Sequence, residues 1–394
     1  MLGVRGGRRD GDLERQHRDD DEQLTDEQQR RRGRRGCGRR GCGRRRWPCG
    51  IAVAFSGVAP GDTTSDRAVV WETPGFLAMM QAYRDYAPIR KVVASAPADP
   101  RTDGTHQLYF SQRWGANLVF ISTDTRSYRD IRLKQLSGST LVDDKGPRAD
   151  HPDRTMLGET QLAWLKQSLL DAKAAGVFWK VVAVSSPIDE AASTSGNGAI
   201  PLDTGKTWIG GYRAERNELL KFVDDNDIHN VVFLTTDDHE LRVNELTYFG
   251  GAGDPSGPRV LVPHALSIVA GPFGAFGPGL ISDHGFENIL GLAEGIVAQQ
   301  AANGVDPLGL DPQFSGLQNV FRKDDPMADS LRQAVDFYSP DTFNYVVLDV
   351  GADGQTLAVN AYGTLPHPRD TFPDPASLPA SERILGFELV AAPE

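Results

Sequence analysis

The amino-acid sequence predicts an α/β protein with a layered core and a mostly parallel central sheet. Three apolar runs rich in β-branched residues predict buried strands, at residues 117–123, 179–185 and 230–235. Two amphipathic segments lie between these runs, GETQLAWLKQSLLDAKAAG and GYRAERNELLKFVDDND, and each places its leucines on one helical face. Alternation of buried strands with such helices is typical of βαβ units, which build a parallel sheet.

The flanking regions contain weaker signals. FLAMMQAYRDY, residues 76–86, predicts a helix that ends before Pro88, because the residue before a proline avoids the α region. From Val260 to about Gln313, frequent Gly and Pro predict long loops with little regular structure. Near the end, residues 343–350 and 356–362 predict a β-hairpin turned by GADG.

These signals divide the chain into four parts. Residues 1–50 are rich in Arg and Gly and have almost nothing apolar to bury, so we expect a disordered head. Residues 51–75 predict two short strands, residues 76–365 form the main domain, and residues 366–394 form a C-terminal tail. All three cysteines lie in the head and carry little information about the compartment.

Charge is divided unevenly between these parts. The formal net charge is −11, but residues 1–50 hold 15 Arg against 9 Asp and Glu, which leaves 27 basic and 44 acidic residues in the remainder. An acidic body lacks the clustered Lys and Arg that bind phosphate backbones, so we expect no nucleic-acid partner for it. The head itself is open to three interpretations: a basic arm that binds nucleic acid, a solvated tail, or a mistaken start site or reading frame.

We find neither a membrane-spanning segment nor an export signal in the sequence. The apolar runs are strand-sized, well short of the roughly 18 residues that a membrane-spanning helix needs, so we expect no membrane span. The arginines of the head lead into only a short apolar stretch, so no export signal is legible and the compartment stays open. Oligomeric state is not legible either.

The most informative stretch is NVVFLTTDDHELRVNEL, in which a buried strand runs directly into polar residues. Parallel-sheet enzymes place their sites at this end of their strands. Asp237 and His239 follow the strand, and a carboxylate beside an imidazole is a donor set for a hard cation and for iron or zinc. The alternative is that this turn merely caps a following helix.

Polar residues also follow the other two predicted strands, at residues 124–129 and at Ser185 and Ser186. If the three strands are parallel, these loops converge. Arg126 would then be placed to bind a phosphate oxygen through its planar guanidinium. A buried structural salt bridge from Arg126 to a neighbouring carboxylate is the alternative.

The segment WIGGY, Trp208 to Tyr212, stands at the start of a predicted helix and can form one wall of a substrate pocket. Packing of these aromatic rings in the core is the competing interpretation. Other enzyme classes lack their signatures, since the sequence contains no G-x-S-x-G elbow, no G-x-x-x-x-G-K-[ST] loop, no H-E-x-x-H and no strand followed by G-x-G-x-x-G.

Several ordered pieces resemble the alkaline phosphatase D (PhoD-like) family. SGVAPGDTTSDRAVVWE resembles that family's opening β-sandwich segment. AYRDYAPIR, LYFSQRWGANLVFISTDTRSYRD, LGETQLAWLKQSLLDAKAAGVFWKVVAVSSPI and GYRAERNELLKFVDDNDIHNVVFLTTDDHELRVNEL resemble the rear of its phosphatase domain, in the family's order. The pieces cover most of residues 56–246, and their joint occurrence is far more specific than any single one.

The resemblance implies a metallophosphoesterase-like fold and hydrolysis of phosphate mono- or diesters at a centre of Ca²⁺ and Fe³⁺. Asp237 and His239 match the family's Asp-x-His metal motif, with His239 also the candidate catalytic residue, although Thr236 replaces the usual preceding Gly. Trp208 and Tyr212 resemble the family's Trp/Gly/Tyr element near the substrate, and we expect Arg126 to assist in substrate binding.

One departure from the family changes these expectations. WETPG runs straight into FLAMMQAYRDYAP, whereas the family has a long segment at this point, between Gly75 and Phe76, that carries its front metal ligands. We therefore expect an incomplete sheet, a β-sandwich remnant at residues 51–75, and little or no phosphatase activity, because two ligands are too few for two cations. The alternative is a non-catalytic remnant that serves as a binding or structural module.

Overall fold

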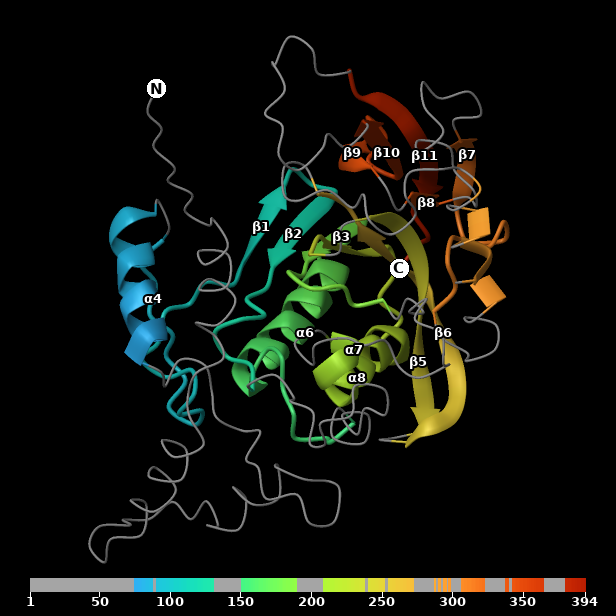
Figure 1. The fold of residues 1–394 in the computed structure, drawn as a ribbon. Helices are drawn as coiled ribbons and strands as arrows, with labels where there is room; N and C mark the ends of the chain where they lie inside the picture. Colours follow the sequence, from blue (N-terminus) through green and yellow to red (C-terminus); the bar gives the residue numbers. More distant parts are fainter. Residues whose placement is uncertain are drawn as a thin grey trace, which may run out of the picture. The chain divides into compact units, whose positions relative to one another are not determined.

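A computed structural model describes residues 74–87, 90–130, 150–189, 208–237, 240–251, 254–272, 306–322, 337–339, 342–364 and 380–394, with isolated residues between 287 and 298. All of them belong to the second of two units, Met1–Cys49 and Gly50–Glu394. The elements (Figure 1) are α4 Pro74–Tyr86, β1 Phe110–Trp114, β2 Leu118–Ser122, α6 Glu159–Ala174, β3 Trp179–Ala183, α7 Trp208–Gly211, α8 Arg213–Asp225, β4 Val231–Thr235, β5 Leu241–Gly251, β6 Asp254–Val269, β7 Leu317–Arg322, β8 Tyr338–Ser339, β9 Phe343–Val350, β10 Thr356–Thr364 and β11 Glu382–Val390.

A seven-stranded sheet with the order β1-β2-β3-β4-β6-β5-β8 forms the centre of the fold. The three pairings that join β2, β3, β4 and β6 are parallel, and the three outer pairings are antiparallel. The prediction of an α/β fold built around a large sheet is confirmed. The expectation of a mostly parallel sheet holds only for the four inner strands, so the sheet as a whole is mixed.

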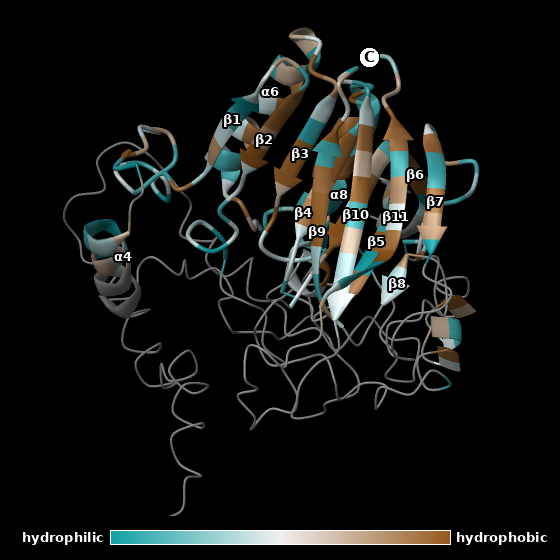
Figure 2. Cartoon of the chain, turned by 90° about the horizontal axis from the view of Figure 1, so that it is seen from above, coloured by the Kyte–Doolittle hydropathy of each residue, from teal (hydrophilic) through white to brown (hydrophobic). Residues whose placement is uncertain are grey.

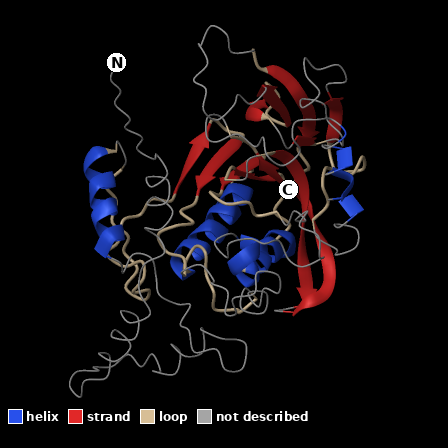
Figure 3. Ribbon diagram, in the orientation of Figure 1, coloured by secondary structure: helices blue, strands red, loops and turns tan. Residues whose placement is uncertain are grey.

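Helices α6 and α8 cover one face of this sheet (Figure 3). Leu162, Leu165 and Leu169 of α6 pack with Leu219 and Leu220 of α8 against one set of alternating strand residues. Each helix connects two parallel neighbours of the sheet, as expected for βαβ units. In the described residues, no helix combines the length and the apolar character needed to cross a bilayer.

A second, four-stranded antiparallel sheet with the order β7-β11-β10-β9 covers the opposite face (Figure 2). Leu357 and Val359 of β10 and Phe387 of β11 pack with Val181 and Val232, which point away from the helices. Both sides of the inner strands are therefore buried. This explains why their sequences are continuous apolar runs rather than alternating patterns.

Most predicted elements are confirmed. Strands β2, β3 and β4 fall within the three predicted runs, and α6 and α8 fall within the two amphipathic segments. The chain leaves α6 through Gly176, whose φ of 63° favours glycine. The predicted helix at residues 76–86 is present as α4, and the predicted hairpin is present as the antiparallel pair β9 and β10.

The prediction of long loops from Val260 to about Gln313 is wrong for its first ten residues, because β6, with 16 residues, extends to Val269. Most of the remainder of that range lies outside the described residues. The prolines of β6 were the misleading signal. Strand β4 pairs with β6 only from Ala265 to Val269, so along its first half the sheet needs hydrogen bonds on the β5 side alone. Proline is tolerated in a strand segment of this kind, since an absent N–H can face away from the ladder.

The structure describes only part of the four predicted regions of the chain. Residues 1–50 and most of residues 51–75, the predicted head and β-sandwich remnant, lie outside the described residues. Residues 366–394, which we expected to be a tail, contribute β11 between β7 and β10. Gly75 and Phe76, where the family's front segment would be inserted, are consecutive residues of α4.

Candidate functional site

Polar loops meet at the edge of the seven-stranded sheet where the parallel strands β2, β3 and β4 end. The hydroxyl of Thr125, after β2, shares a short hydrogen bond with the hydroxyl of Ser185, after β3. Nη2 of Arg126, after β2, lies 3.6 Å from Oδ2 of Asp237, after β4. The convergence of the three loops that the sequence predicts is therefore present in the structure.

The loop after β2 is held by hydrogen bonds to its backbone. Oδ1 of Asp124 accepts hydrogen bonds from the N–H groups of Arg126 and Ser127, each 2.9 Å long. The buried amide of Gln161, in the first turn of α6, accepts from the N–H of Asp124 at 2.7 Å and donates to its carbonyl at 2.8 Å. The backbone that carries Arg126 is thus fixed from both sides.

The pair formed by Arg126 and Asp237 lies at the surface. Their side chains are 41% and 30% exposed, so the alternative of a buried structural salt bridge does not describe this pair. An exposed pair at this separation contributes about 0–1 kcal/mol and is easily separated. Asp237 also has a φ of 80°, a region that Asp tolerates better than most residues. The ion pair is therefore too weak to keep either side chain from binding a ligand.

Two buried polar atoms at this edge lack a hydrogen-bond partner among the described residues. They are Oδ2 of Asp124 and Oγ of Ser186. Leaving a buried polar atom unsatisfied costs roughly 1–3 kcal/mol. With the guanidinium of Arg126 and the carboxylate of Asp237, they give the edge a mixture of anion-binding and cation-binding groups.

The second residue of the predicted metal motif, His239, lies outside the described residues together with Asp238. Within the ranges that are described, no group of three or more His, Cys, Asp or Glu side chains gathers at one point. The element that follows is β5, a strand, so the alternative that this turn caps a helix is wrong.

Trp208 and Tyr212 lie in the core on the helix side of the sheet, and neither side chain has measurable exposure. The hydroxyl of Tyr212 donates a hydrogen bond of 2.5 Å to the carbonyl of Asp130, at the far end of the loop that carries Arg126. The guanidinium of Arg154 stacks over the ring at 4.8 Å. Burial raises the pKa of Tyr212 to about 12, so the hydroxyl stays a donor at neutral pH. Tyr212 thereby ties α7 and α8 to this loop.

A buried carboxylate holds the same helix start to the segment before α6. Glu215 accepts hydrogen bonds from the N–H groups of Met156 and Leu157, at 3.0 and 2.8 Å, and from the hydroxyl of Thr155. Burial raises its pKa from 4.5 to about 7, against the opposing effect of these hydrogen bonds. Sequence reasoning missed both Glu215 and Gln161. The sequence feature that could have identified them is a polar residue on the buried side of an amphipathic helix.

Comparison with known proteins places this sequence in a family. The model of the family described as PhoD-like phosphatase matches residues 70–279, more than half of the chain. Alkaline phosphatase D of Bacillus subtilis (strain 168) is 33% identical over 169 residues, which are 43% of this chain and 26% of that protein. The chain thus spans about a quarter of this relative's length.

Among solved structures, one titled "Structure of PhoD" is similar with a TM-score of 0.45 and 19% identity, over 72% of this chain and 46% of that chain. The match of the family model over more than half of the sequence is the finding that decides membership. This chain belongs to the PhoD-like phosphatase family.

Proposed function

We propose that the chain carries the rear part of a phosphoric ester hydrolase, and that phosphate esters bind at the sheet edge after β2, β3 and β4. The observation that carries this proposal is the approach of Arg126 to Asp237 across two parallel strand ends. A planar cation that suits phosphate and a carboxylate that suits a metal ion stand side by side there. Membership in a phosphatase family supports the same assignment.

Binding of a phosphate ester would use groups that are already in place. Arg126 would turn from Asp237 to two phosphate oxygens. This exchange costs little free energy, because an exposed ion pair is weak. The hydroxyls of Thr125 and Ser185, which hydrogen-bond to each other after β2 and β3, are the further donors that we propose for the remaining oxygens. A direct substrate contact by Trp208 or Tyr212 stays a prediction. Their burial favours an indirect role, in which Tyr212 positions the loop that carries Arg126.

The cations that the family resemblance implies are Ca²⁺ and Fe³⁺, with Asp237 and His239 as their proposed ligands in this chain. When bound, such cations activate a water molecule and stabilise negative charge on the phosphoryl group. The donors available in the described ranges do not fit a two-cation centre, because no three potential ligands gather there.

We propose that turnover is impaired for the same reason. Gly75 and Phe76 are neighbours within α4, at the point where the family carries its front ligands, and no other segment of the sequence replaces them. A site with Arg126 but without an activated nucleophile binds a phosphate ester without hydrolysing it. The alternative is a non-catalytic module that has kept the fold and lost the metal site altogether.

Metal content separates these two readings. The purified chain is incubated with calcium and iron, desalted and analysed for both metals, beside Asp237→Asn and the matched control Asp225→Asn on the exposed end of α8. The proposal predicts about one bound cation per chain, lost in Asp237→Asn and retained in Asp225→Asn. Substantially less than one cation per chain, with no effect of Asp237→Asn, would favour the non-catalytic module.

A further inference from the structure

Strand β1 forms one end of the seven-stranded sheet. It pairs with β2 on one side, and no strand among the described residues pairs with the other. All five of its residues are exposed, including two aromatic ones, Phe110 at 44% and Trp114 at 68%. Proteins usually protect such edges with charge, proline or a covering segment, because unpaired backbone groups recruit other strands.

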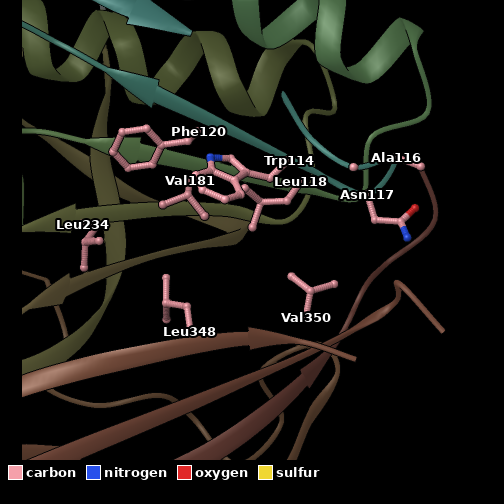
Figure 4. A pocket seen from close by; sticks show the side chains of 10 residues that line it. Trp114, Ala116, Asn117, Leu118, Phe120, Val181, Leu234, Leu348 and Val350 are labelled. Atoms are coloured by element: carbon pink, nitrogen blue, oxygen red, sulfur yellow. The ribbon is translucent and has the colours of Figure 1, made fainter. Parts of the chain in front are cut away.

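The aromatic residues of β1 continue an apolar face of the sheet. The register with β2 sets Gln112 opposite Phe120 and Trp114 opposite Leu118, so these side chains share the face that looks toward the four-stranded sheet. A cavity of about 580 Å³ opens on this face, and Trp114, Phe120, Val181, Leu234, Leu348 and Val350 line it (Figure 4). In the part of the chain that the structure describes, the four-stranded sheet ends at β9 and does not extend over β1 (Figure 2).

We propose that β1 pairs with β1 of a second copy of this chain, antiparallel and with the two-fold axis at Gln112. The sequence FSQRW is self-complementary in this register. Phe110 of each copy faces Trp114 of the other on the apolar face, and Ser111 faces Arg113 on the opposite face. Aromatic cross-strand pairs of this kind contribute roughly 0.2–1 kcal/mol each, beyond the backbone hydrogen bonds.

Charge selects the antiparallel arrangement. A parallel, in-register pairing would set Arg113 directly against Arg113 of the second copy, and like charges in opposed positions are destabilising. The antiparallel arrangement places a neutral serine there instead. It also joins the two uncovered apolar faces into one, flanked on each side by a four-stranded sheet. Both features favour a second copy of the chain over an unrelated charged strand as the occupant of this edge.

The area involved predicts a weak dimer. Aromatic side chains bury about 150–250 Å² each, so the exposed parts of Phe110 and Trp114 from two copies supply roughly 500 Å². Stable interfaces bury about 1,200–2,000 Å² in total. The backbone of two five-residue strands does not close that difference. We therefore expect reversible, concentration-dependent association in the micromolar range rather than a permanent dimer.

Sedimentation equilibrium of the full chain across the micromolar range tests the proposal through the residue on the two-fold axis. Gln112→Lys and Gln112→Glu each place like charges opposite one another, and each is expected to weaken dimerisation at least about tenfold, or 1.4 kcal/mol. An equimolar mixture of the two variants is expected to associate at least as strongly as the wild type. Gln318→Lys, on the exposed face of β7 in the other sheet, is the control and is expected to behave as the wild type.

A wild-type chain that stays monomeric throughout this range would overturn the proposal, as would dimers that both charge variants retain. Dimers lost in both variants but not restored in the mixture would place the axis elsewhere and overturn the register proposed. Both variants are expected to fold, because Gln112 is exposed, and circular dichroism checks this. A monomer that instead binds the apolar dye ANS in a Trp114-dependent way would assign the cavity to small apolar molecules and contradict self-pairing.

Discussion

Nη2 of Arg126 lies 3.6 Å from Oδ2 of Asp237, although the two residues follow different strands of the sheet. This contact depends on the parallel order of β2, β3 and β4, which brings the ends of all three strands to one edge. It also links the two binding properties that we propose for the edge. The guanidinium available to a phosphate is the same group that neutralises the carboxylate available to a cation.

Phosphate binding should therefore depend on the planar fork of Arg126. We expect Arg126→Gln to weaken binding of inorganic phosphate about tenfold or more, because a charge-assisted hydrogen bond contributes about 1.5–3 kcal/mol. The phosphate affinity of Arg126→Lys should lie between those of Arg126→Gln and the wild type, since lysine keeps the charge but lacks the planar guanidinium. Isothermal titration calorimetry measures both. Equal affinity in wild type, Arg126→Gln and the control Lys221→Gln, an exposed residue of α8, would remove Arg126 from the site.

Stability should change with pH through Glu215. Its folded pKa of about 7 lies above the ordinary value of 4.5, so the folded state favours the protonated form. The resulting stabilisation is complete below pH 4.5 and is lost as the pH rises through 7, by on the order of 1–3 kcal/mol. Urea unfolding of Glu215→Gln across this window should lack that loss. The exposed control Glu159→Gln should keep it, and identical pH slopes in all three proteins would contradict the assignment.

The hydroxyl of Tyr212 should contribute to stability. Tyr212→Phe removes the hydrogen bond to the carbonyl of Asp130 and leaves that buried acceptor with one partner fewer, which should lower the free energy of unfolding by roughly 0.5–1.5 kcal/mol. Urea unfolding and phosphate titration are measured on the same preparation. We expect lower stability together with a loss of phosphate affinity that is smaller than in Arg126→Gln, because Tyr212 acts only through the loop that carries Arg126. A loss of affinity without a loss of stability would instead support direct contact between Tyr212 and the substrate.

A buried ion pair between α8 and Asp306 should contribute strongly to the stability of the fold. Arg216 pairs with Asp306 at 2.5 Å and donates to the carbonyls of Ile188 and Thr247, and both charged side chains are almost fully buried. Asp306→Ala leaves the arginine without its counter-charge and should cost about 3–5 kcal/mol. Denaturant midpoints measure the loss. Asp225→Ala, which breaks an exposed pair, should cost less than about 1 kcal/mol, and equal costs would show that burial does not strengthen the effect.

The sequence could predict the inner strands and both long helices because their signals are local. Val181, Val182 and Phe233 lie in strands buried on both faces, so the apolar runs are continuous, and Leu165 and Leu169 mark the single buried face of α6. Strands β1 and β6 lacked such signals. Strand β1 is exposed throughout, and β6 contains prolines that only its one-sided pairing tolerates, a property of the sheet and not of the segment.

Part of the candidate site was predictable for a similar reason. Arg126 and Asp237 each follow a recognisable strand, and parallel strands bring such positions together. The supporting residues were not predictable. Gln161 binds the loop after β2 and Glu215 binds the segment before α6, and both contacts join residues that only the tertiary packing of the helices brings together. A polar residue within an apolar helical stripe indicates burial but does not indicate its partner.

Hydrolysis of an aryl phosphate and an aryl phosphodiester, with calcium and iron added, tests the central proposal most directly. The wild-type chain is compared with His239→Ala and with a chain that carries a family front segment between Gly75 and Phe76. We predict turnover near background in the first two and an increase of orders of magnitude in the third, since only the third regains the missing ligands. Robust turnover by the wild-type chain that His239→Ala abolishes would contradict this proposal and show that other residues of the chain complete the metal site.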